Sequence, residues 1–459
     1  MLKVKFVEPH IKYPVIQEHV GFNLGLLSTA SYALSNLGNE ISVSYLSLRL
    51  NRICGKNDDI ETEISKNTPD IVGVSAMTCD FLDAINVIRT AKEFGAKTVL
   101  GGIFPSLNYV EIMKNYPEVD IIVRGEGESS FYEILKSEIE GFPISDVLGI
   151  TYRNHNNVAI SNKNRSFLGL KEIPVSKYHL MPIENFHELR IPCSVFTSRG
   201  CSYNCLFCSL RDMWEGIYRT RPISNVVEEL RLLGKSYGFK RVKLVDEVIT
   251  SDPERLKFLL TTVKQQGINL NFRINSRLDL LNKELLEDLY ELGVDQVLFG
   301  VDSISNELLQ SMGKFQASTN LSESWKDKAL RIVKEAVGIG YTLFPTFMLG
   351  WPGETQSTLI KTAEFAINIG KNDNVIPYLS FITPHPGSQL HALSPNLGLK
   401  ILTSDLRRYT HLFPVAVPIS LGENGLNLLV KTYDSIAQGT NSREWNPEID
   451  GEYLDIFKN

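Results

Sequence analysis

The hydrophobic pattern of residues 1–145 predicts a parallel sheet. Short apolar runs alternate with amphipathic stretches, and the apolar runs are "KVKFVEP", "ISVSYLSL", "DIVGVSAMT", "AKTVLGG" and "VDIIVRG". Apolar strands separated by helices are typical of a doubly wound α/β domain. Ligands of such domains bind beyond the carboxyl ends of the strands, where the loops of this chain are small, glycine-rich and polar.

A second alternating series of strands and helices begins near residue 191. Strands are predicted at 193–198, 241–246, 270–275, 296–301, 341–349 and 375–383. Helices are predicted near 223–237, 253–266, 282–292, 304–312, 325–339 and 354–370. Six strand–helix units indicate a partial (βα)6 barrel of the TIM type, with its chemistry at the C-terminal ends of the strands.

The pattern divides the chain into four parts. We expect an α/β domain over 1–145, a linker with a hairpin over 146–190, the barrel over 191–390 and a small C-terminal extension over 391–459. The extension is expected to cap the open end of the barrel.

The composition indicates a globular protein and does not suggest a nucleic-acid-binding or membrane protein. The 459 residues are 43% hydrophobic and 22% charged, as in a soluble globular protein of more than one domain. A net charge of −6 without a basic block does not indicate a nucleic-acid or membrane-surface partner. The N-terminus lacks the apolar region of a signal peptide, and no apolar run reaches membrane-spanning length. With its free cysteines, the chain is expected in the reducing cytoplasm.

The stretch "CSYNCLFCS", residues 201–209, holds three of the six cysteines. An odd number at such short spacing does not suit disulfides, and a structural zinc site needs four ligands. Cys201, Cys205 and Cys208 therefore indicate a metal centre with one open position. A C-x3-C-x2-C loop suits a cubane iron–sulfur cluster that leaves one iron without a protein ligand. A zinc loop or buried thiols are the alternatives.

This motif, with the aromatic Phe207 before its last cysteine, resembles the signature of the radical S-adenosylmethionine (SAM) superfamily. The resemblance implies a [4Fe–4S] cluster whose open iron binds SAM and cleaves it to a 5′-deoxyadenosyl radical. Further segments resemble the cobalamin-binding members of that superfamily over residues 1–390, among them "VKLVDEVITSDPERL", "INSRLDLL", "FGVDSISNELLQSMGK" and "FMLGWPGET".

The resemblance implies SAM contacts at the ends of the barrel strands. The residues concerned are Phe207, Asp246, Glu247, Arg273, Asn275, Arg277, Asp302, Ser303 and Gly350. Asp246 and Glu247 have an alternative interpretation as a solvated helix start with Ser251 as its N-cap. Arg273, Asn275 and Arg277 alternate along one strand face, so they point into the barrel, where an unpaired charge is costly. Asp302-Ser303 stands where the family more often has Glu-Ser.

The resemblance also implies cobalamin contacts at the strand ends of the first domain. The residues concerned are Ser75, Met77, Thr78, Gly101, Gly102, Phe104, Pro105, Gly125, Glu126 and Gly127. The motif Asp-x-His-x-x-Gly is absent, and His10 and His19 are the only histidines in this part of the chain. Cobalamin is therefore expected without a histidine below the cobalt. The alternative is a domain that no longer binds cobalamin.

The function that this resemblance implies is cobalamin-dependent methylation of an unactivated carbon, or of phosphorus, in a small-molecule biosynthetic intermediate. An external one-electron reductant of the flavodoxin or ferredoxin type is expected. One alternative is a rearrangement, cyclisation or ring contraction that uses the same cofactors. The other is a non-catalytic iron–sulfur or corrin-binding protein. The sequence indicates no catalytic acid or base and no particular substrate.

Overall fold

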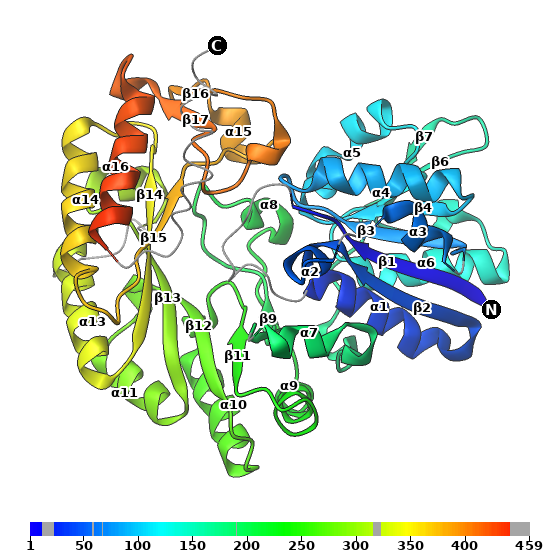
Figure 1. Ribbon diagram of the computed structural model, residues 1–459, viewed down its shortest axis with the longest axis horizontal. Coiled ribbons are helices and arrows are strands. Elements are labelled where there is room, and N and C mark those ends of the chain that lie inside the picture. The colour runs from blue at the N-terminus through cyan, green and yellow to red at the C-terminus, as the bar shows by residue number, and fades with distance from the viewer. Residues whose placement is uncertain (12–22, 57–58, 67, 190, 315–322, 441–459) are drawn as a thin grey trace.

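The N-terminal part of the chain folds around one seven-stranded sheet with the strand order β2-β1-β3-β4-β5-β6-β7. The computed structural model (Figure 1) describes residues 1–11, 23–56, 59–66, 68–189, 191–314 and 323–440. Five parallel strands form the predicted doubly wound core: β1 (Leu2–Glu8), β2 (Ile41–Ser47), β3 (Ile71–Ser75), β4 (Lys97–Gly101) and β5 (Ile121–Val123).

Helices cover both faces of this sheet, because its strands are apolar on both sides. On one face α1 (Leu24–Leu37) packs beside α6 (Gly127–Glu140), and on the other lie α2 (Leu48–Ile53), α3 (Ile60–Ser65), α4 (Phe81–Glu93) and α5 (Ile103–Asn115). The predicted hairpin is formed by β6 (Ile150–Arg153) and β7 (Ala159–Ser161). It pairs with β5 in the antiparallel direction, so it extends the sheet instead of lying apart as a linker.

The second sheet has six parallel strands in the order β15-β14-β13-β12-β11-β8. They are β8 (Cys193–Val195), β11 (Arg241–Leu244), β12 (Asn271–Arg277), β13 (Val294–Asp302), β14 (Thr342–Leu349) and β15 (Tyr378–Phe381). The helices are α9 (Ile223–Arg231), α10 (Pro253–Gln265), α11 (Lys283–Glu291), α12 (Asn306–Ser311), α13 (Trp325–Ile339) and α14 (Gln356–Ile369). This is the predicted partial barrel, curled with its helices outside (Figure 1).

Local signals explain where these helices begin. The Asn282 side chain accepts a hydrogen bond from the Leu285 amide and starts α11. The N-cap of α10 is Asp252, which accepts from the Arg255 amide, and not the predicted Ser251. Asp252 takes this role because Pro253 follows it at the first helical position, where a missing amide proton costs nothing.

A short excursion separates β8 from β11 and carries the cysteine motif. It contains the two-stranded ribbon of β9 (Ser198–Arg199) and β10 (Arg219–Thr220), with α8 (Leu210–Trp214) between them. Before β8, the short helix α7 (Ile183–Glu188) packs its Phe186 into the barrel core.

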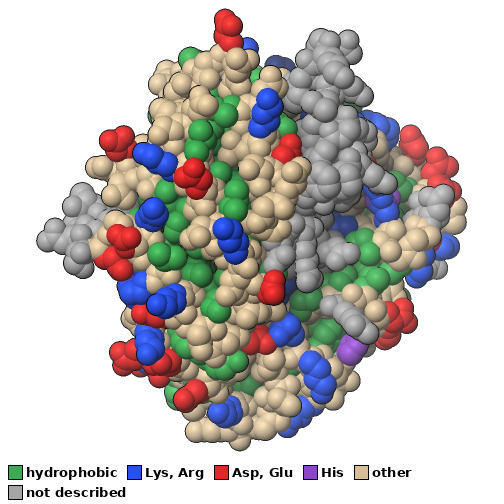
Figure 2. Space-filling view, turned by 60° about the vertical axis from the view of Figure 1, so that its left-hand side comes forward, with side chains coloured by type: hydrophobic (Ala, Val, Ile, Leu, Met, Phe, Trp, Pro, Cys, Tyr) green, Lys and Arg blue, Asp and Glu red, His purple; other side chains and the backbone are tan. Residues whose placement is uncertain are grey.

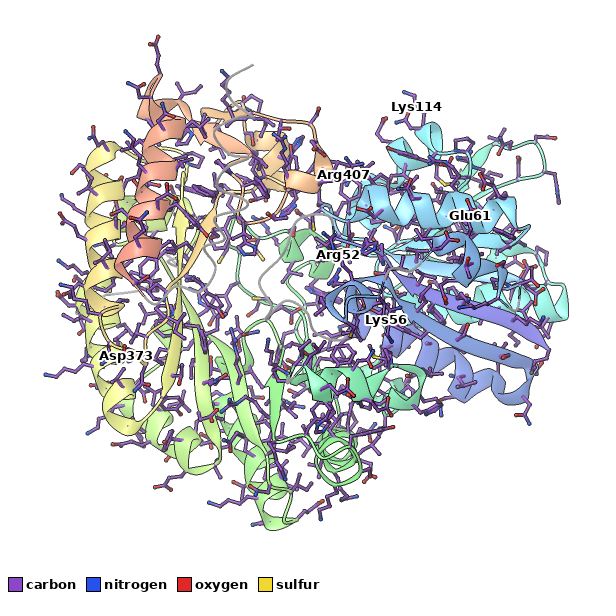
Figure 3. The ribbon with its side chains drawn as sticks, viewed as in Figure 1. Arg52, Lys56, Glu61, Lys114, Asp373 and Arg407 are labelled. Atoms are coloured by element: carbon purple, nitrogen blue, oxygen red, sulfur yellow. The ribbon has the colours of Figure 1, made fainter. Side chains whose placement is uncertain are left out.

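The C-terminal segment is integrated into both domains. It contains α15 (Gln389–Leu393), β16 (Leu399–Ile401), β17 (Ala416–Pro418) and α16 (Gly425–Gly439). Helix α16 packs along α14, and Tyr433 stacks on Phe381 with ring centroids 5.0 Å apart. Leu406 packs against the N-terminal core, and Figure 3 places Arg407 beside the N-terminal domain.

The surface mixes both signs of charge. On the face shown in Figure 2, basic and acidic side chains are interspersed over the outer helices, which agrees with the small net charge of −6. Among the described residues, no helix has the length and apolarity that a membrane crossing requires.

Candidate active site between the two sheets

The three motif cysteines lie together on the loop that follows β9. Burial, together with the neighbouring thiols, raises the pKa of Cys201 and raises that of Cys208 to about 11. Thiols in this setting become thiolates when a cation compensates their charge, so the donor set suits a metal centre. Within the described part of the chain, no three His, Cys, Asp or Glu residues are grouped to hold a single ion. A cubane cluster differs from such a site because each of its cysteines binds a different iron.

Two acidic residues that follow β11 accept hydrogen bonds from the segment that precedes the cysteine loop. The buried Asp246 carboxylate accepts hydrogen bonds from the Thr197 amide at 3.1 Å, the Thr197 hydroxyl at 2.9 Å and the Ser198 hydroxyl. The Glu247 carboxylate accepts one from the Gly200 amide at 3.2 Å. Asp246 therefore holds the backbone that leads to the cysteines, and its contact with SAM stays a prediction.

Arg277, at the end of β12, contacts a motif cysteine directly. Its Nη1 lies 3.5 Å from the Cys205 sulfur, and its Nη2 donates to the Lys314 carbonyl at 2.7 Å and to Asp279 at 2.8 Å. The Tyr203 ring stacks on the guanidinium at 3.9 Å. Arg277 is thus a neighbour of the cluster ligands, fixed on several sides.

The loop after β14 lies beside the cysteine motif. The Phe207 ring meets the Trp351 ring edge-on, with centroids 6.3 Å apart. Gly350 has a φ of 90°, which favours glycine, and its amide donates to the Glu354 carboxylate at 2.8 Å. Burial raises the pKa of Glu354 to about 7. Phe207 and Gly350, both predicted to contact SAM, therefore belong to one corner of the barrel.

The other two predicted residues of β12 also point into the barrel, as the alternation predicts. Arg273 is buried, with its guanidinium 4.1 Å from the Phe344 ring centre, and the Asn275 side chain donates to the Asp246 carbonyl at 3.2 Å. Asn275 therefore links two strand ends of the site.

Asp302 and Ser303, at the end of β13, point in different directions: Asp302 lies inside the barrel and Ser303 faces the outer helices. Asp302 has a φ of 62° and forms a buried ion pair with Lys314 at 2.5 Å. The Ser303 hydroxyl lies 3.5 Å from the Thr362 hydroxyl of α14, so it faces the outer helices.

A cavity of about 290 Å³ opens between the N-terminal sheet and the excursion after β8. Its floor is apolar, with Phe6 and Phe131, and the six predicted cobalamin residues that line it are Ser75, Gly101, Gly102, Gly125, Glu126 and Gly127. From the barrel side it is lined by Phe196, Ser198, Arg199, Trp214, Val245 and Glu247. Such a slot, apolar below and rich in backbone groups at its rim, suits a large cofactor with a planar ring.

Four predicted cobalamin residues lie elsewhere. Phe104 and Pro105 are buried in α5, where Phe104 packs on Phe81 with ring centroids 4.7 Å apart. Met77 is exposed, and the Thr78 hydroxyl is 3.0 Å from Nδ1 of His385 in the barrel. Of the two N-terminal histidines, His19 lies outside the described residues, and His10 is not among those that line the cavity.

Sequence reasoning missed several residues of this region. Arg199, Trp214 and Lys314 are the most prominent, and their partners lie far away in the sequence or on other elements. Arg199 stands two positions before Cys201, and that proximity was the one available signal.

Two family profiles match this chain, one over part of each sheet. Residues 195–366 match the radical SAM superfamily, and residues 19–135 match the B12 binding domain. An uncharacterized methyltransferase of Pyrococcus horikoshii is 30% identical over 364 residues, which cover 78% of this chain and 76% of that protein. The anaerobic magnesium-protoporphyrin IX monomethyl ester cyclase of Rubrivivax gelatinosus is 26% identical, over 80% of this chain and 66% of that protein.

A solved structure shows the same fold. The radical S-adenosylmethionine methyltransferase TsrM of Kitasatospora setae, with cobalamin and a [4Fe–4S] cluster bound, has a TM-score of 0.75 at 17% identity. The match covers 96% of this chain and 89% of that one. This chain belongs to the radical SAM superfamily, in the group whose members carry an N-terminal B12 binding domain.

Proposed function

We propose that this protein is a cobalamin-dependent radical SAM methyltransferase that acts on a small-molecule biosynthetic intermediate. The observation that carries the proposal is that Glu247 connects the cavity of the B12 binding domain to the cysteine loop. Glu247 lines the cavity and accepts a hydrogen bond from Gly200, the residue before Cys201. Two cofactors bound at these places would lie next to each other.

The family implies three cofactors: a [4Fe–4S] cluster, SAM and cobalamin. When bound, the cluster and SAM supply a 5′-deoxyadenosyl radical, and cobalamin supplies a methyl group. Cys201, Cys205 and Cys208 would hold the cluster. The predicted residues at the strand ends would bind SAM, and the glycine-rich rim with Ser75 and Glu126 would bind cobalamin.

The chain's own contribution is to bind, orient and exclude water. Asp246 and Glu247 fix the backbone before the cysteines, and Arg277 contacts the Cys205 sulfur. Phe207 and Trp351 form an apolar wall beside the loop. These two rings would help to keep water away from a radical formed beside the loop.

The electron for this chemistry is proposed to come from an external flavodoxin or ferredoxin. Cys54, Cys79 and Cys193 are separated from the motif in sequence, and burial raises the pKa of Cys79 to about 12. Burial likewise raises the pKa of Cys193 far above its ordinary value. Because these three cysteines are scattered along the chain, they do not form a second cluster motif.

Isotope labelling tests the proposal. Reconstituted protein, a chemical reductant and SAM with a deuterated methyl group are incubated with a metabolite extract under anaerobic conditions. We expect S-adenosylhomocysteine, 5′-deoxyadenosine and a product that gains one labelled methyl group. Cys208→Ala is the control, and it should form neither 5′-deoxyadenosine nor the labelled product.

Two other outcomes would replace the proposal. An unlabelled product formed together with 5′-deoxyadenosine would indicate cyclisation or rearrangement, the class to which the named Rubrivivax relative belongs. Failure to form any 5′-deoxyadenosine with an intact cluster would indicate a carrier protein.

A further inference from the structure

Four charged side chains meet where the two domains join. Glu126 and Glu128 come from the start of α6, and Arg199 and Arg219 come from the ribbon β9–β10 on the barrel side. Arg199 bonds Glu126 at 2.8 Å and Glu128 at 2.6 Å, while Arg219 bonds both oxygens of Glu126 at 2.9 Å. We call these four residues the Glu–Arg network.

The network is buried and its charges are balanced. The exposed fractions of the four side chains are 6% for Glu126, 2% for Glu128, 12% for Arg199 and 16% for Arg219. Charges at this depth are tolerated only when they are paired and hydrogen-bonded. Burial raises the pKa of Glu128, but the Arg199 guanidinium and the Ser28 hydroxyl more than offset it, so this pKa lies below its ordinary value. Glu128 is therefore held in its charged form opposite the Arg199 guanidinium.

Aromatic rings fix the two guanidinium groups in place. Arg199 lies 4.3 Å from the centre of the Phe196 ring, and Arg219 lies 4.5 Å from that of Phe167. Arg219 also lies 5.6 Å from the Trp214 ring centre. These contacts restrict the side chains to one geometry, because guanidinium groups stack on aromatic faces.

The network lies between the cavity and the cysteine loop. Glu126, Glu128 and Arg199 all line the cavity of about 290 Å³. Arg199 is separated from Cys201 by Gly200 alone. A shift of α6 relative to the ribbon would therefore move the cavity rim and the cluster ligands against each other.

We propose that the Glu–Arg network is a positioning device that sets the distance between bound cobalamin and the iron–sulfur cluster. This inference rests on the proposed function and deepens it. Its members act as positioning residues, and Glu126 acts mainly through the two arginines to which its carboxylate is already bonded. Buried ion pairs suit this task, because they specify geometry even when they add little stability.

The test uses the holoenzyme with the substitution Arg219→Gln. Arg219 is chosen over Arg199 because Arg199 is only two residues from Cys201. Pulsed electron paramagnetic resonance measures the distance between cob(II)alamin and the reduced cluster. We expect full iron and corrin content, a broadened distance distribution and a kcat about 100-fold lower. The KM for SAM should stay within about twofold, because the SAM site itself is unchanged. Arg241→Gln is the matched control, since it breaks the Arg241–Asp295 ion pair elsewhere on the barrel and should leave the distance unchanged.

Glu126→Gln is the second variant, isosteric and on the other domain. It should broaden the same distribution, and the double variant should be no worse than the more damaging single one. Unchanged distance distributions in both variants with full cofactor content would overturn the proposal. Loss of cofactors in both variants would overturn it too, since the network would then serve folding. A wild-type protein with a sharp distance but no methylation would instead refute the proposed function alone.

Discussion

Replacing Arg277 with glutamine should make the cluster harder to reduce. The guanidinium lies 3.5 Å from the Cys205 sulfur and carries the positive charge nearest to that ligand in the described contacts. Reduction adds one electron to the cluster, so a positive donor stabilises the reduced state more than the oxidised one. Arg277→Gln removes that preference and should lower the midpoint potential.

The size of the shift follows from the contact. A hydrogen bond to a charged group contributes about 1.5–3 kcal/mol, and we assign about 1 kcal/mol of it to the difference between oxidation states. A tenfold change in equilibrium constant, about 1.4 kcal/mol, equals 59 mV for one electron, so the shift is roughly 43 mV to more negative potential. The Lys314 carbonyl also loses its donor, which costs about 1–3 kcal/mol of folding stability.

A redox titration followed by electron paramagnetic resonance, without SAM, measures this potential. Arg273→Gln is the matched control, because Arg273 lies on the same strand but stacks on Phe344. Its potential should change much less. An unchanged or more positive potential in Arg277→Gln, with full iron content, would refute the reasoning.

Two further predictions concern the backbone before the cysteines and the loop after β14. Gly200 has a φ of 93°, and a Cβ there would lie 1.9 Å from the Ile217 carbonyl oxygen, so Gly200→Ala should lose most of its iron after reconstitution. Gly216→Ala, at a φ of 76° with open space, should retain its iron, and equal iron contents would contradict this account. The pKa of Glu354 is raised to about 7 in the folded state from 4.5, so folding stability should fall by about 3 kcal/mol as pH rises from 4.5 through 7. Glu354→Gln should remove this part of the pH dependence in denaturant unfolding at pH 5 and pH 8, and an identical slope in both proteins would contradict it.

The sequence predicted best what depends on local periodicity. Arg273, Asn275 and Arg277 point into the barrel because side chains alternate along a strand and the opposite face packs on helices. Their partners were not predictable, since Cys205, Phe344 and Asp246 come from other strand ends. Non-local contacts of this kind leave no trace in the spacing of one segment.

The residues predicted to contact cobalamin show the same limit of sequence-based prediction within the first domain. Glycines at the ends of β4 and β5 line the cavity, because the parallel strands bring their ends to one edge. Phe104 and Pro105 follow the same strand end, but α5 begins at Ile103 and turns them into the core. A shift of one or two residues in the start of a helix therefore decides whether a side chain lies at the cavity rim or in the domain core.

The Glu–Arg network illustrates why interdomain contacts need a structure. Glu126 was predicted as a cofactor contact from the family resemblance, and it lines the cavity. Its bonds to Arg199 and Arg219 span 73 and 93 positions of sequence. The sequence alone therefore does not show that the start of α6 contacts the β9–β10 ribbon.

The central claim is that one chain holds a cluster and a corrin side by side, and cofactor stoichiometry tests it most directly. Anaerobically reconstituted protein is analysed for iron, sulfide and corrin, with Cys208→Ala as the control for the cluster. The account predicts about four irons, about four sulfides and one tightly held cobalamin per chain. A protein that keeps its four irons but retains no corrin at any cobalamin concentration would contradict it.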